Sequence, residues 1–166
     1  MTDFAQDAAL ARKGDTEAFS RLYALVYKDL YHIALYSLKN VHDASDAVSD
    51  TVMDAFCSIK KLKDEKAFRS WIMRILSAKI KRRQKEYLTG SQELDENITG
   101  EFDYDSFELK EALENLDSES RLILSMSVLG GYTSQEIARI CNIKEGSVRS
   151  RLSRIRQKLR MKLEDK

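Results

Sequence analysis

The stretch TSQEIARICNIKEGSVRSRLSRIRQKLRMK, residues Thr133–Lys162, decides the fold of the C-terminal part of the chain. Its pattern predicts two helices joined by a short turn at Cys141–Ile143. Thr133 suits the N-cap of the first helix, and Glu136 lies three residues later, where it can complete a capping box. The second helix has one apolar stripe, because its apolar residues recur at spacings of four, three and four. These residues are Val148, Leu152, Ile155 and Leu159.

The polar side of the second helix favours binding to DNA. At about 100° per residue, small hydroxyl residues project away from the apolar stripe and stand beside arginines. Short side chains allow close approach to a major groove, and guanidinium groups can grip guanine edges or phosphates. A solvated basic helix in a bundle is the alternative interpretation. The predicted DNA-binding residues on this helix are Ser147, Arg149, Ser150 and Arg154, with Arg151 adding positive charge farther round.

The composition favours helix along almost the whole chain. Its 166 residues include no proline and only six glycines, and leucine, alanine, lysine, arginine and glutamate are abundant. This length allows one large domain or two small ones. The net charge of +1 averages over separate acidic and basic blocks, so it indicates little about partners. We expect an all-α protein.

Several classes of function and location are disfavoured by what the sequence contains. Cys57 and Cys141 lie far apart, each within or beside an apolar helical pattern, which indicates buried free thiols in a reducing compartment. There is no signal peptide and no apolar run of membrane-spanning length. We therefore expect a cytoplasmic protein without membrane insertion. The sequence has no phosphate-binding loop, catalytic triad or metal-ligand cluster, so we expect neither an enzyme nor a cofactor or metal.

The N-terminal block contains an acidic row on one predicted helix. Asp43 is expected to cap this helix, and Phe56 is expected in its buried stripe. Like charges four residues apart repel and weaken a helix. Such a row suggests a basic partner surface, although a plain solvated face fits the spacing equally well. The acidic row consists of Asp46, Asp50 and Asp54.

The helix that begins at Phe68 changes character along its length. Its first half has an apolar core stripe, whereas Lys79–Lys85 contains five basic residues. That number exceeds what the negative end of the helix dipole requires. Basic side chains beside an aromatic-bearing helix can follow a phosphate backbone while apolar groups receive unstacked bases. The predicted nucleic-acid-binding residues here are Lys79, Lys81, Arg82 and Arg83.

A change of composition separates two predicted domains. Residues 87–106 lack basic residues and a sustained period, which predicts an acidic, flexible linker. We therefore expect a helical bundle in residues 1–86 and a small helical domain in residues 107–166. In the second domain, Ser118 is expected to cap a helix that reaches about Leu129. We also expect the linker's negative charge to shield the basic helices when DNA is absent.

Read together, these blocks resemble the small extracytoplasmic-function group of bacterial RNA polymerase sigma factors, in the sigma-70 family. Three stretches resemble successive motifs of region two: AFSRLYALVYKDLY (Ala18–Tyr31), DASDAVSDTV (Asp43–Val52) and FRSWIMRIL (Phe68–Leu76). Three others resemble region four: LENLDSESR (Leu113–Arg121), GYTSQEIA (Gly131–Ala138) and GSVRSRLSRIR (Gly146–Arg156). The order and spacing of the six motifs make the resemblance specific.

The resemblance implies a promoter-specificity subunit for core RNA polymerase. The 68–83 helix then opens and reads the minus-ten region. The Thr133–Arg156 helix pair reads the minus-thirty-five region, with Thr133 and Gln135 among its DNA contacts. Docking on the clamp helices of the largest polymerase subunit is implied for Asp43, Asp46, Ala47, Asp50 and Thr51. The flap of the second subunit and an anti-sigma protein are further expected partners.

The chain departs from the family pattern at Ser77–Lys81. This segment is one residue short of the asparagine and polar position that commonly follow the W-x-x-R-I motif, so no base contacts are assigned there. Two other functions remain open alternatives: a stand-alone helix-turn-helix regulator that binds operators as a dimer, and a helical adaptor that binds acidic proteins or RNA.

Overall fold

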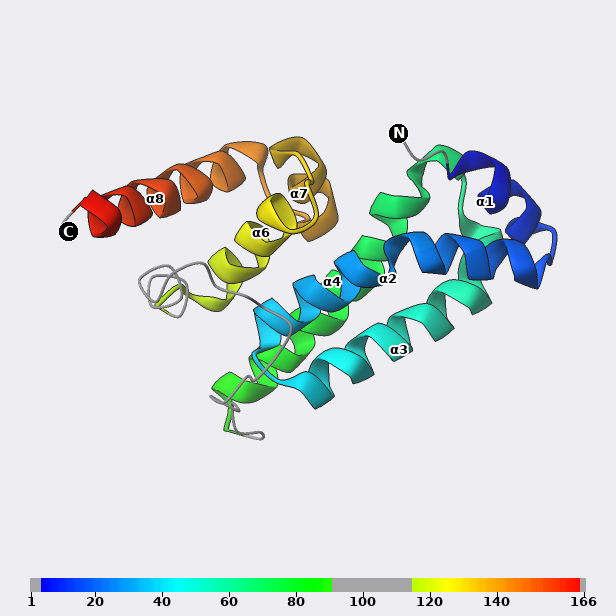
Figure 1. Cartoon of the computed structure of the whole chain (residues 1–166), viewed down its shortest axis with the longest axis horizontal. Helices are drawn as coiled ribbons and strands as arrows, with labels where there is room; N and C mark the ends of the chain where they lie inside the picture. The colour runs from blue at the N-terminus through cyan, green and yellow to red at the C-terminus, as the bar shows by residue number, and fades with distance from the viewer. Residues whose placement is uncertain (1–3, 91–114, 165–166) are drawn as a thin grey trace.

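A computed structural model of the chain describes residues 4–90 and 115–164 (Figure 1). All regular structure in these residues is helical and none is a strand, which confirms the all-α prediction. The helices are α1 (Ala5–Arg12), α2 (Thr16–Leu38), α3 (Val41–Ser58), α4 (Phe68–Leu88), α6 (Ser118–Val128), α7 (Ser134–Cys141) and α8 (Glu145–Glu164), with 3-10 turns at Ile59–Lys61 and Glu65–Ala67. The predicted linker lies outside the described residues, apart from its first four positions, of which two continue α4.

The start of α3 differs from the prediction. The N-cap is Asn40, whose side chain accepts a hydrogen bond from the Asp43 N–H at 3.0 Å. The prediction that Asp43 caps this helix is therefore wrong. Asp43 lies inside the first turn, where a negative charge is favourable near the positive end of the helix dipole. Its carboxylate is thereby directed toward α4.

The start of α6 is also shifted by one residue from the prediction. Asp117 occupies the N-cap, so the prediction that Ser118 caps this helix is wrong. The Asp117 side chain makes no cap hydrogen bond, and its carboxylate accepts a hydrogen bond from Arg151. The helix predicted from residue 107 onward falls mostly outside the described residues.

The helix-turn-helix forms as predicted. Thr133 and Glu136 make both bonds of the capping box: Glu136 N–H donates to Thr133 Oγ1 at 3.1 Å, and Thr133 N–H donates to Glu136 Oε1 at 3.0 Å. Asn142 ends α7 in the left-handed conformation with a φ of 57°, which asparagine tolerates better than most residues. The chain then reverses into α8. The local sequence is sufficient to specify this turn.

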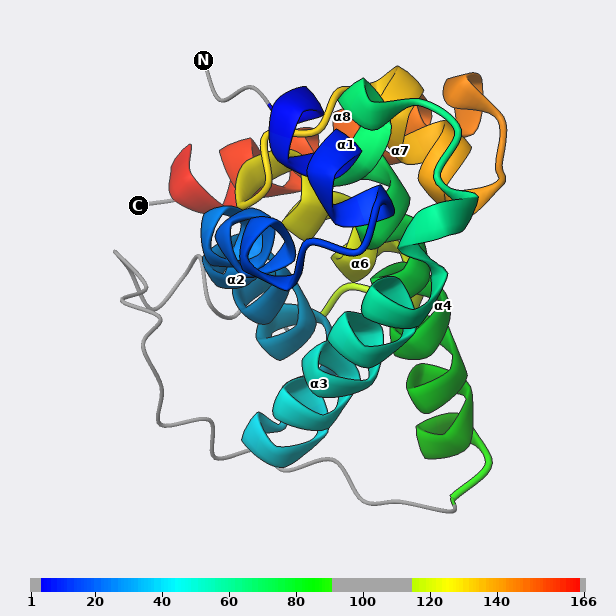
Figure 2. The ribbon, with the colours of Figure 1, turned by 90° about the vertical axis from the view of Figure 1, so that its right-hand side faces the viewer.

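Two helical segments are buried on every side. At the end of α2, Ile33–Leu38 are six consecutive residues that are each at most 8% exposed, and in α6 Ser120–Met126 are seven at most 9% exposed. Successive helical residues point about 100° apart, so a run of this length faces every direction. One-sided packing would leave part of each run in water. Each of the two segments covers a side of the other, because α2 packs against α6 (Figures 1 and 2).

The cysteines are both free thiols, but in different surroundings. Cys141 is buried, as predicted, and burial raises the pKa of its thiol. Cys57 is exposed near the end of α3, so the prediction that it is buried is wrong. Within residues 4–90 and 115–164, no helix has both the length and the apolar character needed to cross a membrane.

The Asn40 cap gives a test of how α3 is positioned. Asn40→Ala should lower the free energy of unfolding by about 1 kcal/mol, because the Asp43 N–H loses its acceptor. Asn40→Asp retains an acceptor and should unfold close to the unmodified chain. Urea titration followed by circular dichroism measures both variants. Equal losses would contradict the capping role.

Candidate nucleic-acid interface and acidic docking face

The outer face of α8 is open to solvent. Ser147, Arg149, Ser150, Ser153 and Arg154, which we call the α8 outer face, are all exposed, while the opposite stripe of Val148, Leu152 and Ile155 is at most 4% exposed. Gly146 and four of these residues, Arg149, Ser150, Ser153 and Arg154, line a shallow hollow. The Arg149–Glu145 ion pair spans 3.9 Å between exposed side chains, so it restrains the guanidinium little. The α8 outer face can therefore meet a flat or grooved partner without rearrangement.

The start of α7 is partly committed to its own turn. Thr133 and Gln135 are both exposed. The Thr133 hydroxyl oxygen already accepts the Glu136 N–H, so the threonine primarily shapes the helix start. Gln135 lies two residues farther along, in the first turn of α7. As DNA contacts, both residues stay predictions.

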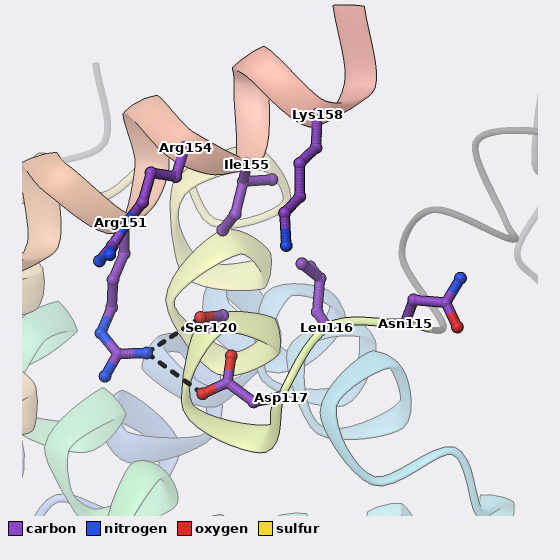
Figure 3. A pocket seen from close by; sticks show the side chains of 8 residues that line it. All are labelled: Asn115, Leu116, Asp117, Ser120, Arg151, Arg154, Ile155 and Lys158. Carbon is purple, nitrogen blue, oxygen red and sulfur yellow. Dashed lines mark hydrogen bonds and ion pairs between the residues drawn. The ribbon is translucent and has the colours of Figure 1, made fainter. Parts of the chain in front are cut away.

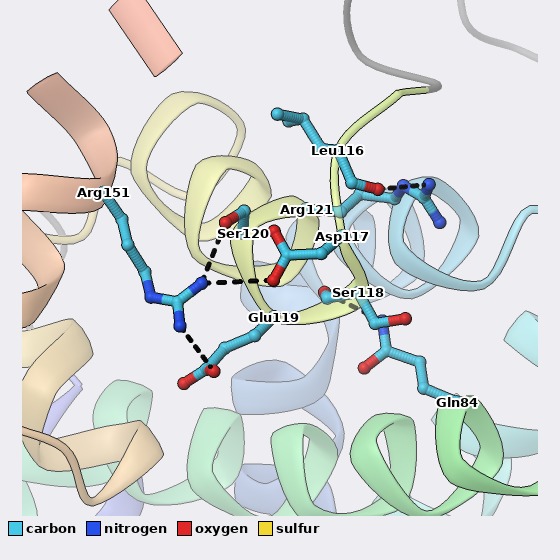
Figure 4. A network of polar contacts seen from close by, with 8 residues as sticks. All are labelled: Gln84, Leu116, Asp117, Ser118, Glu119, Ser120, Arg121 and Arg151. Atoms are coloured by element: carbon cyan, nitrogen blue, oxygen red, sulfur yellow. Dashed lines mark hydrogen bonds and ion pairs between the residues drawn. The ribbon is translucent and has the colours of Figure 1, made fainter. Parts of the chain in front are cut away.

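Arg151 is placed differently from the α8 outer face. Its guanidinium turns toward α6 and donates to Asp117 at 3.2 Å and to Ser120 at 3.0 Å (Figure 3), and also to Glu119 at 3.0 Å (Figure 4). Burial alone would raise the pKa of Asp117, but hydrogen bonds from Ser120 and Arg151 hold it below its usual value. Arg151 therefore fastens α8 to the start of α6, and its predicted role in DNA binding is not supported by its position.

A polar cavity lies between α6 and α8 beside this network (Figure 3). Its walls combine the Arg151–Asp117 pair with two further cations of α8. Leu116 and Ile155 supply the apolar part of the lining. Its lining residues are Asn115, Leu116, Asp117, Ser120, Arg151, Arg154, Ile155 and Lys158.

The basic end of α4, defined as Lys79, Lys81, Arg82 and Arg83, is largely engaged within the protein. Lys79 Nζ lies 2.7 Å from the Asp54 carboxylate, and the Lys81 ammonium donates to the Cys141 carbonyl at 3.0 Å. Arg83 pairs with Asp43 at 3.1 Å, and both side chains are only 14% exposed. Arg82 is exposed. In this conformation, three of the four predicted nucleic-acid-binding cations hold α4 against α3 and α7.

The Arg83–Asp43 pair is extended by a tyrosine. The Tyr87 hydroxyl donates to the second oxygen of the Asp43 carboxylate, and burial together with this bond raises the pKa of Tyr87. Each oxygen of Asp43 thus has a partner from α4. The Asp43 side chain is therefore held against α4 and is only 14% exposed, and its contact with polymerase stays a prediction.

The residues implied to dock on polymerase separate into two groups. Asp46 has a side chain 67% exposed and Asp50 is half-buried at the surface. Ala47 and Thr51 are 0% exposed, and the Thr51 hydroxyl donates to the Ala47 carbonyl at 2.7 Å. These two small residues therefore serve the packing of α3. The surface of α3 that a partner can reach here is acidic and contains Asp46 and Asp50.

An apolar groove beside the acidic row was not predicted. It lies between α2 and α3, and two of its apolar side chains, Met53 and Phe56, are 67% and 47% exposed. The prediction that Phe56 is buried is wrong, because Ala55 already occupies that position of the buried stripe. Phe56 instead packs edge-on against Phe19, with ring centroids 5.3 Å apart. The groove is lined by Thr16, Phe19, Ser20, Tyr23, Val52, Met53, Phe56 and Cys57.

Two stretches of the chain match models of known protein families. Residues 22–86 match the sigma-70 region 2 family, and residues 106–159 match the sigma-70 region 4 family. The chain is 26% identical over 175 residues to the ECF RNA polymerase sigma factor SigW of Bacillus subtilis, covering 93% of each protein. It is 29% identical over 177 residues to the RNA polymerase sigma factor NccH of Alcaligenes xylosoxydans xylosoxydans, covering 96% of this chain and 95% of the relative.

Solved structures share the fold. CnrH, in its complex with the cytosolic domain of CnrY, superposes with a TM-score of 0.74 at 23% identity, over 98% of this chain and 97% of that chain. The sigma factor RpoE of Bartonella quintana, in complex with the anti-sigma factor NepR, superposes with a TM-score of 0.71 at 23% identity, over 88% of this chain and 96% of that chain. The two family matches include most of the chain. The chain therefore belongs to the sigma-70 family, among the extracytoplasmic-function RNA polymerase sigma factors.

Proposed function

We propose that this chain binds core RNA polymerase and directs it to specific promoters, where transcription begins. The observation that carries the proposal is the exposed α8 outer face on a region 4 domain, joined in one chain to a region 2 domain with an acidic docking helix. The region 2 match disfavours a stand-alone helix-turn-helix regulator. The function of a helical adaptor would not explain why the chain matches both sigma-70 region 2 and sigma-70 region 4.

The upstream promoter element is read by α8. Ser147 and Ser150 have short side chains that let the helix enter a major groove. Arg149 and Arg154 stand beside them with guanidinium groups that can bind guanine edges in a bidentate manner or hold phosphates. The apolar stripe on the opposite side keeps the helix rigid against α6 and α7. Recognition therefore requires no folding step in this helix.

Polymerase binds the acidic surface of α3. Asp46 and Asp50 present negative charge to a basic partner, which we assign to the clamp helices of the largest subunit. The flap of the second subunit is the proposed partner of the region 4 domain. We also propose an anti-sigma protein as a regulator, since the structural relative RpoE was solved with one. The protein acts by binding and not by catalysis, and it does so in the cytoplasm, where polymerase and chromosome lie.

The reading role of α8 can be tested on single arginines. Arg149→Ala or Arg154→Ala should weaken recognition of the upstream element by about 1–3 kcal/mol, because a bidentate base contact is lost. Run-off transcription and binding of the reconstituted holoenzyme on matched and scrambled upstream elements measure this loss. Arg160→Ala, an exposed arginine farther along α8, is the control and should have little effect. An equal loss on scrambled DNA would reassign the residue to phosphate contact.

The docking role of α3 can be tested by reversing one charge. Asp46→Lys should reduce co-purification with core polymerase at least tenfold, because a cation would face a basic surface. The side chain is 67% exposed and its contact with Arg83 is long, at 3.8 Å, so the fold should persist. Glu17→Lys makes the same charge change at an exposed position in the first turn of α2 and should retain binding. Undiminished co-purification of the Asp46 variant would refute this docking surface.

A further inference from the structure

The polar cavity between α6 and α8, which we call the α6–α8 cavity, has a volume of about 300 Å³. This volume is at the lower end of the range for sites that hold small molecules. The cavity adjoins the α8 outer face, because Arg154 lines both the cavity and the shallow hollow of that face. The proposed function does not use the rest of the cavity.

The carboxylate in the lining of the α6–α8 cavity is already engaged. Burial alone would raise the pKa of Asp117, but hydrogen bonds from Ser120 and Arg151 hold it below its usual value, so the group is an anion that has its own partners. Arg151 also donates to Glu119 at 3.0 Å (Figure 4). Its guanidinium is thus shared by two carboxylates and forms a wall of the cavity.

Two further cations line the α6–α8 cavity without a paired acid. Among residues 4–90 and 115–164, neither Arg154 nor Lys158 has a carboxylate within ion-pair distance. Figure 3 shows the Lys158 side chain extending from α8 toward Leu116, on the α6 side of the cavity. Residues four apart lie on the same side of a helix, so the two cations face the same space. Their charges favour an anion that can accept hydrogen bonds from both.

The anion that fits this lining is a phosphomonoester. Such a group carries a charge of about −1.5 to −2 at pH 7 and has three strong acceptor oxygens. It can therefore bind the Lys158 ammonium and the Arg154 guanidinium together. Leu116 and Ile155 offer apolar contact to a small organic group attached to the phosphate. A phosphodiester of DNA has one negative charge and a nucleotide on each side, so it fits a recessed cavity less well.

We propose that the α6–α8 cavity is a regulatory site for a small phosphomonoester, which Lys158 and Arg154 hold. The regulatory part rests on the proposed function, because Arg154 also belongs to the α8 outer face that reads the upstream promoter element. One guanidinium cannot bind a phosphate in the cavity and a base edge in the groove at the same time. An occupied cavity therefore weakens promoter recognition.

Binding to the cavity is tested on the full-length protein alone. Methyl phosphate and inorganic phosphate, each titrated at constant ionic strength, should give saturable shifts of the backbone amide signals of α8 and of the start of α6 in NMR spectra. Lys158→Ala should raise the Kd about tenfold, because a charge-assisted hydrogen bond is lost. Lys158→Arg retains the cation and should bind nearly as well as the unmodified chain. Arg160→Ala removes the same charge from α8 outside the cavity and is the control.

The outcomes of this titration separate the possible sources of the phosphate. Dimethyl phosphate, a diester with one negative charge, should bind more weakly than methyl phosphate. A preference for the diester would assign the cavity to a backbone phosphate of DNA and would overturn the proposal. So would the absence of saturable shifts, or equal losses in the Lys158→Ala and Arg160→Ala variants.

A second variant should change the affinity in the opposite direction. Asp117→Asn removes the carboxylate from the lining but keeps an oxygen that can accept from Arg151. It should lower the Kd of methyl phosphate about threefold, because a negative charge no longer faces the ligand. A misfolded variant would not bind more tightly. Unchanged or weaker binding would contradict the proposed site.

The regulatory effect is tested with the reconstituted holoenzyme. Saturating methyl phosphate should lower run-off transcription from a promoter with a matched upstream element about fivefold, because Arg154 is withdrawn from the DNA. The Lys158→Ala variant should lose this response. Full transcription by a protein that NMR shows to be saturated would overturn the regulatory role. If the protein without phosphate confers no promoter-specific transcription, the proposed function fails, whereas the NMR titration still reports whether the cavity binds phosphate.

Discussion

The mutual burial of α2 and α6 is the interaction on which the rest of this structure depends. Residues 33–38 and 120–126 each fill every direction around their helix, so neither domain completes its own core alone. This packing sets the position of α7 on α4 and leaves α8 as the outermost helix of its domain (Figure 1). The open face of α8 and the covered side of α4 are therefore two results of one contact.

Ion pairs between α3 and α4 neutralise part of the charge on these two helices. The acidic residues of α3 face the basic end of α4, and Asp43 and Asp54 each hold one of its cations. Asp46 on α3 and the arginines of the α8 outer face remain exposed and accessible to partners. The net charge of +1 conceals this division between internal pairs and surfaces that are available to polymerase and DNA.

Local sequence patterns predict the helices and the α8 outer face, but not the contacts between distant segments. Helical period determines which side of α8 is buried, so the amino-acid pattern alone assigns Ser147, Ser150 and Arg154 to the surface. The same reasoning assigns Arg83 and Arg151 to DNA, because it counts charge along one helix and takes no account of an acid on another. Their partners, Asp43 and Asp117, lie 40 and 34 residues away. The packing of α2 against α6 could not be predicted for the same reason.

The central position of α6 also bears on how the protein is made. Translation delivers α2 and α4 to the cell before α6 exists, so the nascent chain carries an uncovered apolar strip at Ile33–Leu38 for part of its synthesis. Exposed strips of this kind favour aggregation and attract chaperones. A chain truncated between α4 and α6 would keep this strip without its α6 cover and would be prone to aggregate.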